Sequence, residues 1–153
     1  MDDADKMVRR LVDEREIVAV ALRYCRALDT SDWRLLDDVF TPDAVCRLGH
    51  PDEIVGLEAL KARMQAVLGR LDSSHHMVGN HEVELAGDTA THRCYVQAQH
   101  VRRDAADGSK LLFMVAGRYE DRLRRTARGW RISDRTLTVM WSEGDQAALK
   151  RSD

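Results

Sequence analysis

Two hydrophobic periods divide this chain, and the change between them limits the folds that it can adopt. Up to about residue 71 apolar residues recur at helical spacing, and beyond it they alternate with polar ones. Turn-forming residues interrupt the alternating part at Gly87-Asp88, at 104–108 and at 127–129. The second half therefore predicts four antiparallel strands, over residues 76–85, 89–102, 111–124 and 129–141.

The first half predicts three helices. Apolar residues at helical spacing mark a long helix over 11–28 that ends near Asp29, and a third helix over 56–71. Between them, capping residues precede a short helix from Trp33 to Phe40. Helices followed by a run of antiparallel strands indicate an α+β fold, in which the helices cover one face of a curved sheet.

The remaining segments complete a single domain. A short strand is expected over 44–48, followed by a turn over 49–52. The residues from Gly144 onward are expected to form a frayed polar tail. A chain of 153 residues has room for one substantial hydrophobic core, so one domain over residues 1–153 is expected.

Composition excludes several classes of partner. The chain carries 24 basic and 26 acidic side chains, which gives no overall attraction for nucleic acid or an anionic membrane. No apolar run approaches the roughly 20 residues that span a bilayer, and no signal-like run follows the acidic N-terminus. The arginines within 122–128 indicate a solvated hairpin turn. The odd number of cysteines, without a CxxC pair, predicts buried free thiols at Cys25, Cys46 and Cys94. We therefore expect a soluble cytoplasmic protein.

One face of each alternating segment is expected to point toward the helices. On 89–102 the more apolar face carries His92 and His100 among small and aliphatic residues. On 111–124 the more apolar set includes Phe113, Val115 and Tyr119. Several inward titratable side chains favour a lined cavity over a dry core, because each buried polar group needs a partner.

The adjacent residues His75 and His76 cannot both point inward, since successive side chains of a strand face opposite ways. Val78 and Asn80 lie on the same side as His76, but acidic residues follow on that side. A β-bulge near Gly79 would let the inward face switch, and bulges are common beside functional sites.

Several kinds of chemistry lack their motifs. The sequence contains no HExxH or HxH run, no phosphate-binding GxxxxGK[ST] or GxGxxG, and no GxSxG nucleophile elbow. We therefore expect no metal and no cofactor. What remains is proton transfer between an aspartate and a histidine in a pocket.

Asp29 is the candidate carboxylate. It lies at the predicted C-terminal end of the first helix, where the helix dipole and partial burial would raise its pKa. Paired with His76, it could hold the imidazole in one tautomer and stabilise its protonated form. An alternative interpretation is that Asp29 caps the following short helix.

Four stretches resemble the SnoaL-like branch of the NTF2-like superfamily. They are Tyr24–Trp33 (YCRALDTSDW), His76–Asn80 (HMVGN), Gly87–Ala90 (GDTA) and Gly129–Ile132 (GWRI). The resemblance covers nearly the whole chain. It implies a cone-shaped α+β fold in which a curved, mostly antiparallel sheet with three N-terminal helices encloses a deep pocket. It also selects His76 as the inward histidine and leaves His75 at the rim or surface.

Within that family the pattern is similar to three kinds of lyase. Resemblance to scytalone dehydratases implies roles for Asp29, His76 and His100, and resemblance to bile acid 7α-dehydratases adds Tyr24. Resemblance to hexachlorocyclohexane dehydrochlorinases implies Asn80, in an HxxxN form, and Arg135. Departures from these patterns at Leu48, at Gly117 and Tyr119, and at Tyr24 argue against scytalone dehydration and against that dehydrochlorination.

The function implied is a cofactor-independent lyase of the dehydratase type. His76, Asp29 and Tyr24 are the expected catalytic residues, and the expected substrate contacts are His100, Asn80, Tyr119 and Arg135. Arg135 reaches the pocket only if a further bulge interrupts the last strand. The substrate would be a hydrophobic, cyclic small molecule, and the protein a homodimer or homotrimer. Two alternatives stay open: an isomerase or polyketide cyclase, and a non-catalytic binder or oxygenase small-subunit-like protein.

Overall fold

The computed structural model describes residues 2–103 and 107–150 and divides them into ten elements. The helical elements are the α-helices α1 (Asp3–Asp29) and α2 (Leu57–Leu68) and the 3₁₀ helices η1 (Trp33–Asp38) and η2 (Gln146–Leu149). The strands are β1 (Phe40–Leu48), β2 (Ile54–Val55), β3 (Ser73–Ala86), β4 (Thr89–Arg103), β5 (Lys110–Thr126) and β6 (Gly129–Gly144). The α+β class is as predicted.

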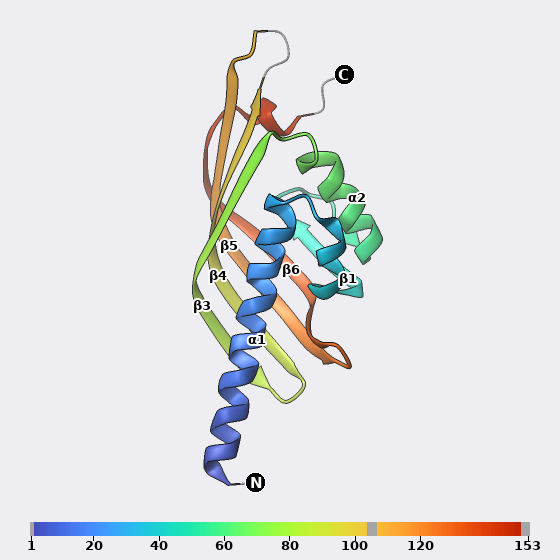
Figure 1. Cartoon of the computed structure of the whole chain (residues 1–153), viewed down its shortest axis with the longest axis vertical. Coiled ribbons are helices and arrows are strands. Elements are labelled where there is room, and N and C mark those ends of the chain that lie inside the picture. Colours follow the sequence, from blue (N-terminus) through green and yellow to red (C-terminus); the bar gives the residue numbers. More distant parts are fainter. Residues whose placement is uncertain (1, 104–106, 151–153) are drawn as a thin grey trace.

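The strands form one curved, mixed sheet. Its order is β2-β1-β6-β5-β4-β3, and only β1 and β6 run parallel among the described strands. Both α-helices lie on the same side of this sheet, α1 across its long strands and α2 beside β1 (Figure 1). The buried residues of α1, including Ile17, Tyr24 and Leu28, pack on the inward faces of the strands and form the core. No helix among residues 2–103 and 107–150 is long and apolar enough to cross a membrane.

The helical part departs from the prediction at three places. The first helix begins at Asp3 and not near residue 11, because Asp2 forms a capping box with Asp5. The expected second helix is only a 3₁₀ helix of six residues, so two of the three predicted N-terminal helices are substantial. Phe40 belongs to β1 and not to that helix. The β1–β6 register shifts between Phe40 and Val45, and this irregularity accommodates Pro42, which has no N–H for a regular ladder.

The C-terminal segment is not a frayed tail up to residue 150. Gly144 ends β6, and the Asp145 backbone N–H donates to the carbonyl oxygen of Leu112. The Asp145 side chain then caps η2 by accepting from the backbone N–H of Ala147. Ala148 is 1% exposed, so burial of this small apolar residue holds the segment on the body of the protein. The expected turn over 49–52 is followed by β2, whose two residues pair with β1.

The inward faces of the strands follow the predicted alternation, and register shifts interrupt it in β3 and at two places in β6. His92 and His100 of β4 and Tyr119 of β5 are buried, and the three cysteines are buried free thiols. The β3–β4 register shifts between Gly79 and Glu82, which confirms the bulge expected near Gly79. One of the shifts in β6, between Ile132 and Asp134, turns Arg135 inward. Each bulge adds one residue and thereby reverses the face on which later side chains lie.

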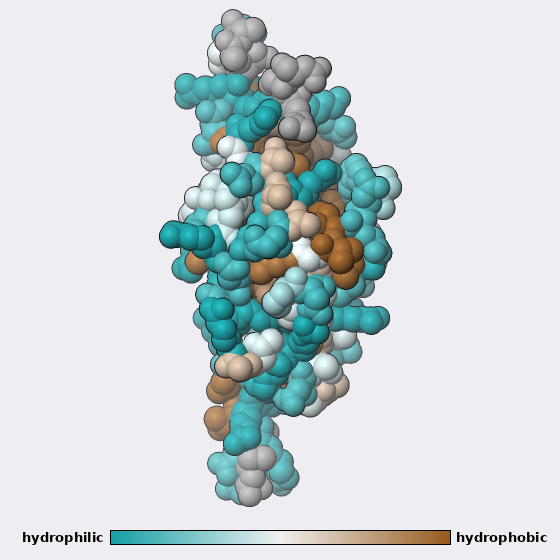
Figure 2. Space-filling model, turned by 90° about the vertical axis from the view of Figure 1, so that its right-hand side faces the viewer, coloured by the Kyte–Doolittle hydropathy of each residue, from teal (hydrophilic) through white to brown (hydrophobic). Residues whose placement is uncertain are grey.

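The surface on the α2 side is mainly hydrophilic, with hydrophobic atoms gathered near its middle (Figure 2). The arginines of the β5–β6 turn are exposed, as predicted, and they pair with acidic side chains. Arg124 contacts Asp43, and Arg125 contacts both Asp13 and Asp88.

Candidate functional site

Asp29 and His76 are in direct contact although 47 positions separate them in the chain. Asp29 is the last residue of α1, and His76 lies on β3 before the bulge. The His76 Nδ1 atom lies 2.7 Å from Asp29 Oδ1, and the His76 backbone N–H donates to Asp29 Oδ2 at 2.9 Å. An ionised carboxylate only accepts hydrogen bonds, so it favours the tautomer with the proton on Nδ1. The lone pair of His76 is then on Nε2.

Asp29 has a lowered pKa, contrary to the expectation of a raised one. Burial raises its pKa, but the hydrogen bonds from the ring and backbone of His76, together with one from the Ser74 hydroxyl, outweigh that effect. The Ser74 Oγ atom lies 3.1 Å from Asp29 Oδ1. The Asp29 carboxylate thus accepts hydrogen bonds from Ser74 and from the backbone and ring of His76. The η1 helix has no side-chain cap, so the alternative interpretation of Asp29 as its cap is wrong.

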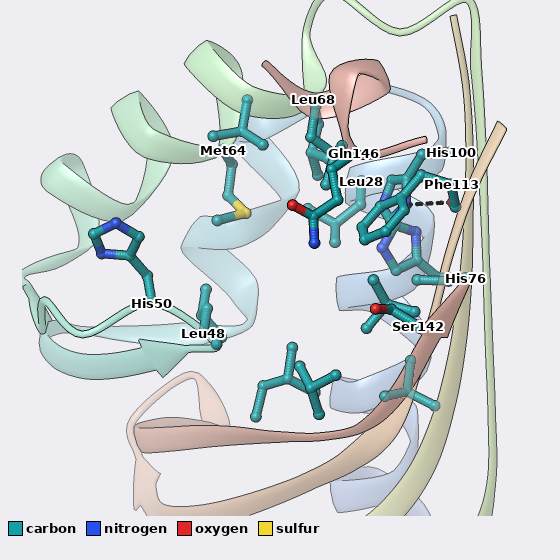
Figure 3. A pocket seen from close by; sticks show the side chains of 18 of the residues that line it. Leu28, Leu48, His50, Met64, Leu68, His76, His100, Phe113, Ser142 and Gln146 are labelled. Atoms are coloured by element: carbon teal, nitrogen blue, oxygen red, sulfur yellow. Dashed lines mark hydrogen bonds between the residues drawn. The ribbon is translucent and has the colours of Figure 1, made fainter. Parts of the chain in front are cut away.

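A cavity of about 530 Å³ opens beside this pair. Three histidines, two tyrosines and three other polar side chains line it: His50, His76, His100, Tyr24, Tyr119, Ser142, Gln146 and Lys150. His76 and His100 lie side by side on one wall, with Met64 and His50 across the cavity (Figure 3). Most other lining side chains are apolar; they include Leu28, Leu48, Met64, Val67, Leu68, Val96, Phe113, Val115, Leu137 and Val139.

His100 is a hydrogen-bond acceptor in this cavity. Its Nδ1–H donates to the carbonyl oxygen of Phe113 at 3.1 Å, which leaves the lone pair on Nε2. Burial, reinforced by the neighbouring His76, lowers the pKa of His100 to about 4. The rings of His76 and His100 meet edge to face with centroids 5.6 Å apart. His100 is therefore neutral near pH 7 and has no proton to give from Nε2.

The low pKa of His100 predicts that stability falls in mild acid. An unfolded histidine has a pKa of about 6.5, so between that value and about 4 the unfolded chain binds more protons than the folded one. This group stabilises fully above pH 6.5, and its contribution is lost as the pH falls. Lowering the pH from 7 to 4.5 should cost the wild type on the order of 2–3 kcal/mol through His100.

Urea unfolding at the two pH values checks this prediction. The His100→Gln variant lacks the titrating imidazole and should lose less stability on acidification, whereas His75→Gln, at an exposed position, should lose as much as the wild type. Equal losses in His100→Gln and the wild type would contradict the prediction.

Tyr24 and Tyr119 both line the cavity, and Arg135 packs against their rings. Their rings meet edge to face at 5.8 Å between centroids. The Arg135 guanidinium lies 4.3 Å from the Tyr24 ring centroid and 4.1 Å from that of Tyr119. Burial raises the pKa of Tyr24 to about 12, although the charge of Arg135 opposes this. Tyr24 therefore keeps its hydroxyl proton and is a hydrogen-bond donor.

Two predicted substrate contacts lie elsewhere. Asn80 is exposed at the bulge of β3, where its φ of 54° places it in the left-handed region. The bulge turns it away from the cavity, so its place in the HxxxN pattern reflects backbone geometry. Arg135 is fully buried behind the tyrosines, where Asp121 binds its Nε at 2.7 Å and its Nη2 at 2.8 Å. It contacts the walls of the cavity from outside.

Sequence reasoning missed Ser74, Asp121 and Gln146. Ser74 lies two residues before His76 on the same strand face, and alternation between Tyr119 and Leu123 points Asp121 inward. The inward positions of Ser74 and Asp121 could therefore have been predicted from periodicity. Gln146 reaches the cavity through η2, for which the polar C-terminal segment gave no signal.

The curved sheet with a helix-covered concave face is also the fold of a solved NTF2-like protein of Novosphingobium aromaticivorans, which is 27% identical with a TM-score of 0.72, over 97% of this chain and 96% of that one. The chain belongs to the SnoaL-like domain family, whose model matches residues 9–136. An uncharacterised protein of Mycobacterium tuberculosis is 34% identical over 139 residues, which are 90% of this chain and 92% of that protein. A Novosphingobium aromaticivorans protein, provisionally assigned as an aromatic ring hydroxylase, is 31% identical with a TM-score of 0.80, over 92% of this chain and 98% of that one.

Two solved structures with lyase names share the fold. One, provisionally assigned as a scytalone dehydratase of Novosphingobium aromaticivorans, has a TM-score of 0.78 at 20% identity over 90% of both chains. A hexachlorocyclohexane dehydrochlorinase has a TM-score of 0.75 at 14% identity, over 94% of this chain and 93% of that one. At these identities the likeness concerns the fold.

Proposed function

We propose that this protein is a cofactor-independent lyase that eliminates water from a hydrophobic, cyclic small molecule. One observation carries the proposal: the Asp29–His76 pair, with 2.7 Å between Oδ1 and Nδ1, is placed on the wall of a mainly apolar cavity of about 530 Å³. The fold shared with proteins of lyase name adds support by analogy.

The proton path needs only the residues of the cavity. His76 Nε2 takes a proton from the carbon next to the one that bears the leaving hydroxyl. The carbon–hydrogen electron pair forms the new double bond as the carbon–oxygen bond breaks. Asp29 stabilises the imidazolium that results, and the imidazolium then gives its proton to the departing oxygen. Water leaves, and His76 returns to its starting state.

The neighbouring side chains assist through hydrogen bonds. Tyr24 keeps its proton because its pKa is raised to about 12, so it donates to the oxygen that gains negative charge. His100 accepts from a hydroxyl of the substrate and thereby orients it. Among the lining residues within 2–103 and 107–150 other than histidine, only Lys150 carries a full charge, which favours a substrate that is neutral and largely apolar.

Product analysis tests the proposed function. The purified chain is incubated with a panel of cyclic alcohols that carry an acidified C–H next to the hydroxyl group, and the products are followed by mass spectrometry. Loss of water from a panel member supports the lyase. Conversion without change of mass would contradict elimination, and ligand binding without any conversion would favour the non-catalytic binder.

The second candidate is an isomerase, which one observation favours. His76 and His100 each present an unprotonated nitrogen to the same cavity, at 5.6 Å between ring centroids. One of them could remove a proton from one carbon of an unsaturated ketone and return it to another. A product of unchanged mass would distinguish this reaction.

Removal of the Tyr24 hydroxyl should slow the reaction without changing the fold. The Tyr24→Phe variant keeps the ring that packs on Phe40 and Arg135 but lacks the donor. Loss of one donor aimed at developing negative charge costs roughly 10²-fold in kcat. Steady-state kinetics of Tyr24→Phe, on a panel member that the wild type dehydrates, checks this loss of kcat. A fall in kcat/KM that arises from KM alone would instead assign Tyr24 to ground-state binding.

We also propose self-association through the sheet face that points away from the helices. Met77 and Tyr95 are each more than half exposed there, on neighbouring strands. Apolar and aromatic side chains of this kind are enriched in interface cores. Light scattering would give the mass, and a monomer at micromolar concentration would contradict a stable dimer or trimer.

A further inference from the structure

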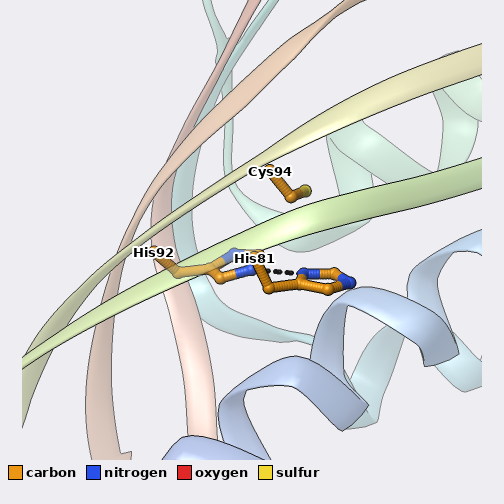
Figure 4. Close-up of side chains that lie close together, drawn as sticks. All are labelled: His81, His92 and Cys94. Atoms are coloured by element: carbon orange, nitrogen blue, oxygen red, sulfur yellow. Dashed lines mark hydrogen bonds between the residues drawn. The ribbon is translucent and has the colours of Figure 1, made fainter.

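A second cluster of titratable side chains lies apart from the cavity, at the bulge of β3. His92 and Cys94 are two residues apart on the inward face of β4, and His81 faces them from the bulge of β3 (Figure 4). The His81 Nδ1 and His92 Nε2 atoms are 3.0 Å apart, and their rings stack with centroids at 5.3 Å. One nitrogen of each histidine and the Cys94 sulfur all lie within 4.8 Å of one another.

The partner of His92 on its other side is a buried carboxylate. Asp121 Oδ2 lies 3.0 Å from His92 Nδ1, and both side chains are fully buried. Asp121 thus places the His92 proton on Nδ1 and directs the lone pair of Nε2 toward His81. A carboxylate that fixes the far nitrogen of a histidine in this way is the usual support of a metal ligand.

The surroundings also give the cluster an entry from solvent. His92 is 1% exposed and Cys94 2% exposed, whereas His81 is only partly buried. A groove between α1 and β3 is lined by residues that include Glu14, Val18 and His81. An ion could therefore arrive at His81 first and be held by the two buried residues behind it.

We propose that His81, His92 and Cys94 bind a divalent transition-metal ion, with zinc as the best fit to two imidazoles and one thiolate. Zinc prefers this donor set in a tetrahedral arrangement, and three protein ligands leave the fourth position for water. On binding, the Cys94 thiol proton is replaced by the metal and released, and the His81 proton moves from Nδ1 to Nε2. The two nitrogens, His81 Nδ1 and His92 Nε2, are 3.0 Å apart, and the sulfur lies within 4.8 Å of one nitrogen of each histidine. Tetrahedral zinc needs roughly 3.3 Å between nitrogens and roughly 3.6 Å between nitrogen and sulfur.

Such a site would act on the fold and not on the substrate. None of the three side chains is among the residues that line the large cavity. The ion would join β3 to β4 at the β3 bulge, where the regular ladder is interrupted. The sequence predicted no metal because it lacks the contiguous motifs. The cluster forms only because the left-handed backbone at Asn80 turns His81 inward.

Cobalt binding tests the inference, because cobalt(II) substitutes for zinc and a bond to thiolate absorbs in the near ultraviolet. The full chain, without a polyhistidine tag and stripped of metal by a chelator, is titrated with CoCl₂ alone. We expect saturation at one ion per chain with a thiolate-to-cobalt absorption band. The His81→Gln variant should lose this band and bind at least roughly 10²-fold more weakly, since even changes to the groups supporting a ligand cost 10- to 100-fold.

Matched variants separate this site from other thiols and from misfolding. The partly buried His81 tolerates substitution best, so its variant is the main test. Cys94→Ser should also lose the band, while His75→Gln, at an exposed position on the same strand, should bind as the wild type does. Added ZnCl₂ should raise the Tm of the wild type and leave that of His81→Gln unchanged. Absence of saturable binding in the wild type, or equal binding by His81→Gln, would overturn the inference.

Discussion

Replacement of His76 by alanine is expected to lower kcat by roughly 10²- to 10⁴-fold, the usual contribution of a general base. The reason lies in the geometry. Asp29 holds the proton on Nδ1, so Nε2 is the nitrogen that can accept a proton from substrate. Alanine leaves the cavity without this base, and His100 cannot replace it from its own position, 5.6 Å away between ring centroids. Steady-state kinetics on a panel member that the wild type dehydrates gives the measurement.

Two controls make the His76 result specific. His75→Ala removes the exposed histidine next to it on the strand, and its kcat should match that of the wild type. Asp29→Asn keeps an acceptor for the Nδ1 proton but removes the charge that stabilises the imidazolium, so its loss of kcat should be smaller than that of His76→Ala. If His76→Ala kept full turnover while it stayed folded by circular dichroism, His76 would not be the base.

The inward positions could be predicted where the chain obeys a simple period. Alternation placed His92, His100 and Tyr119 correctly, because each lies on a strand with an apolar inward face. The expected bulges near Gly79 and before Arg135 are both present. In contrast, the pairing of Asp29 with His76 followed from the exclusion of other chemistries, and the choice of His76 over His75 rested on resemblance to a family, since no local pattern relates two residues that are 47 positions apart.

The pKa of Asp29 and the position of Arg135 could not be predicted, because both depend on side chains of other strands. The pKa of Asp29 is lowered because three donors converge on it, and two of these belong to His76 and one to Ser74. The helix dipole and burial, which are the two effects that the sequence indicates, predicted a raised pKa for Asp29. Similarly, Arg135 does point inward, but Asp121 on the adjacent strand keeps it behind the tyrosines. The role of η2 was missed because Ala148 and Leu149 are too few to produce a periodic signal.

Asp121→Asn is expected to destabilise the protein by about 3–5 kcal/mol, the usual cost of leaving one partner of a buried ion pair alone. Asp121 lies directly opposite Arg135 on β6 and opposite His92 on β4. Both oxygens bind the Arg135 guanidinium, and Oδ2 also binds His92. Burial raises the pKa of Asp121, but the charge of Arg135 and the bonds from both partners outweigh it, so the net pKa is lowered. The carboxylate is therefore charged in the folded protein.

The asparagine variant leaves the Arg135 charge without a counter-ion, because the amide is neutral and replaces one of the two acceptor oxygens by an NH₂ donor. The contacts of Arg135 with the Tyr24 and Tyr119 ring faces persist, but they replace only part of the lost attraction. For a chain of this size the loss corresponds to a fall in Tm of roughly 6 to 20 °C. Thermal and urea unfolding at pH 7 measure it, and the wild type sets the reference.

An exposed ion pair on the same sheet is the matched control. Asp43→Asn breaks the pair with Arg124, in which both side chains are well exposed, and it should cost no more than about 1 kcal/mol. The double variant Asp121→Leu with Arg135→Met removes both buried charges, so it should recover much of the stability lost in Asp121→Asn. Equal effects of Asp121→Asn and Asp43→Asn would show that burial does not strengthen the inner pair. A double variant less stable than Asp121→Asn would instead mean that Arg135 stabilises the fold mainly through packing on the two tyrosines.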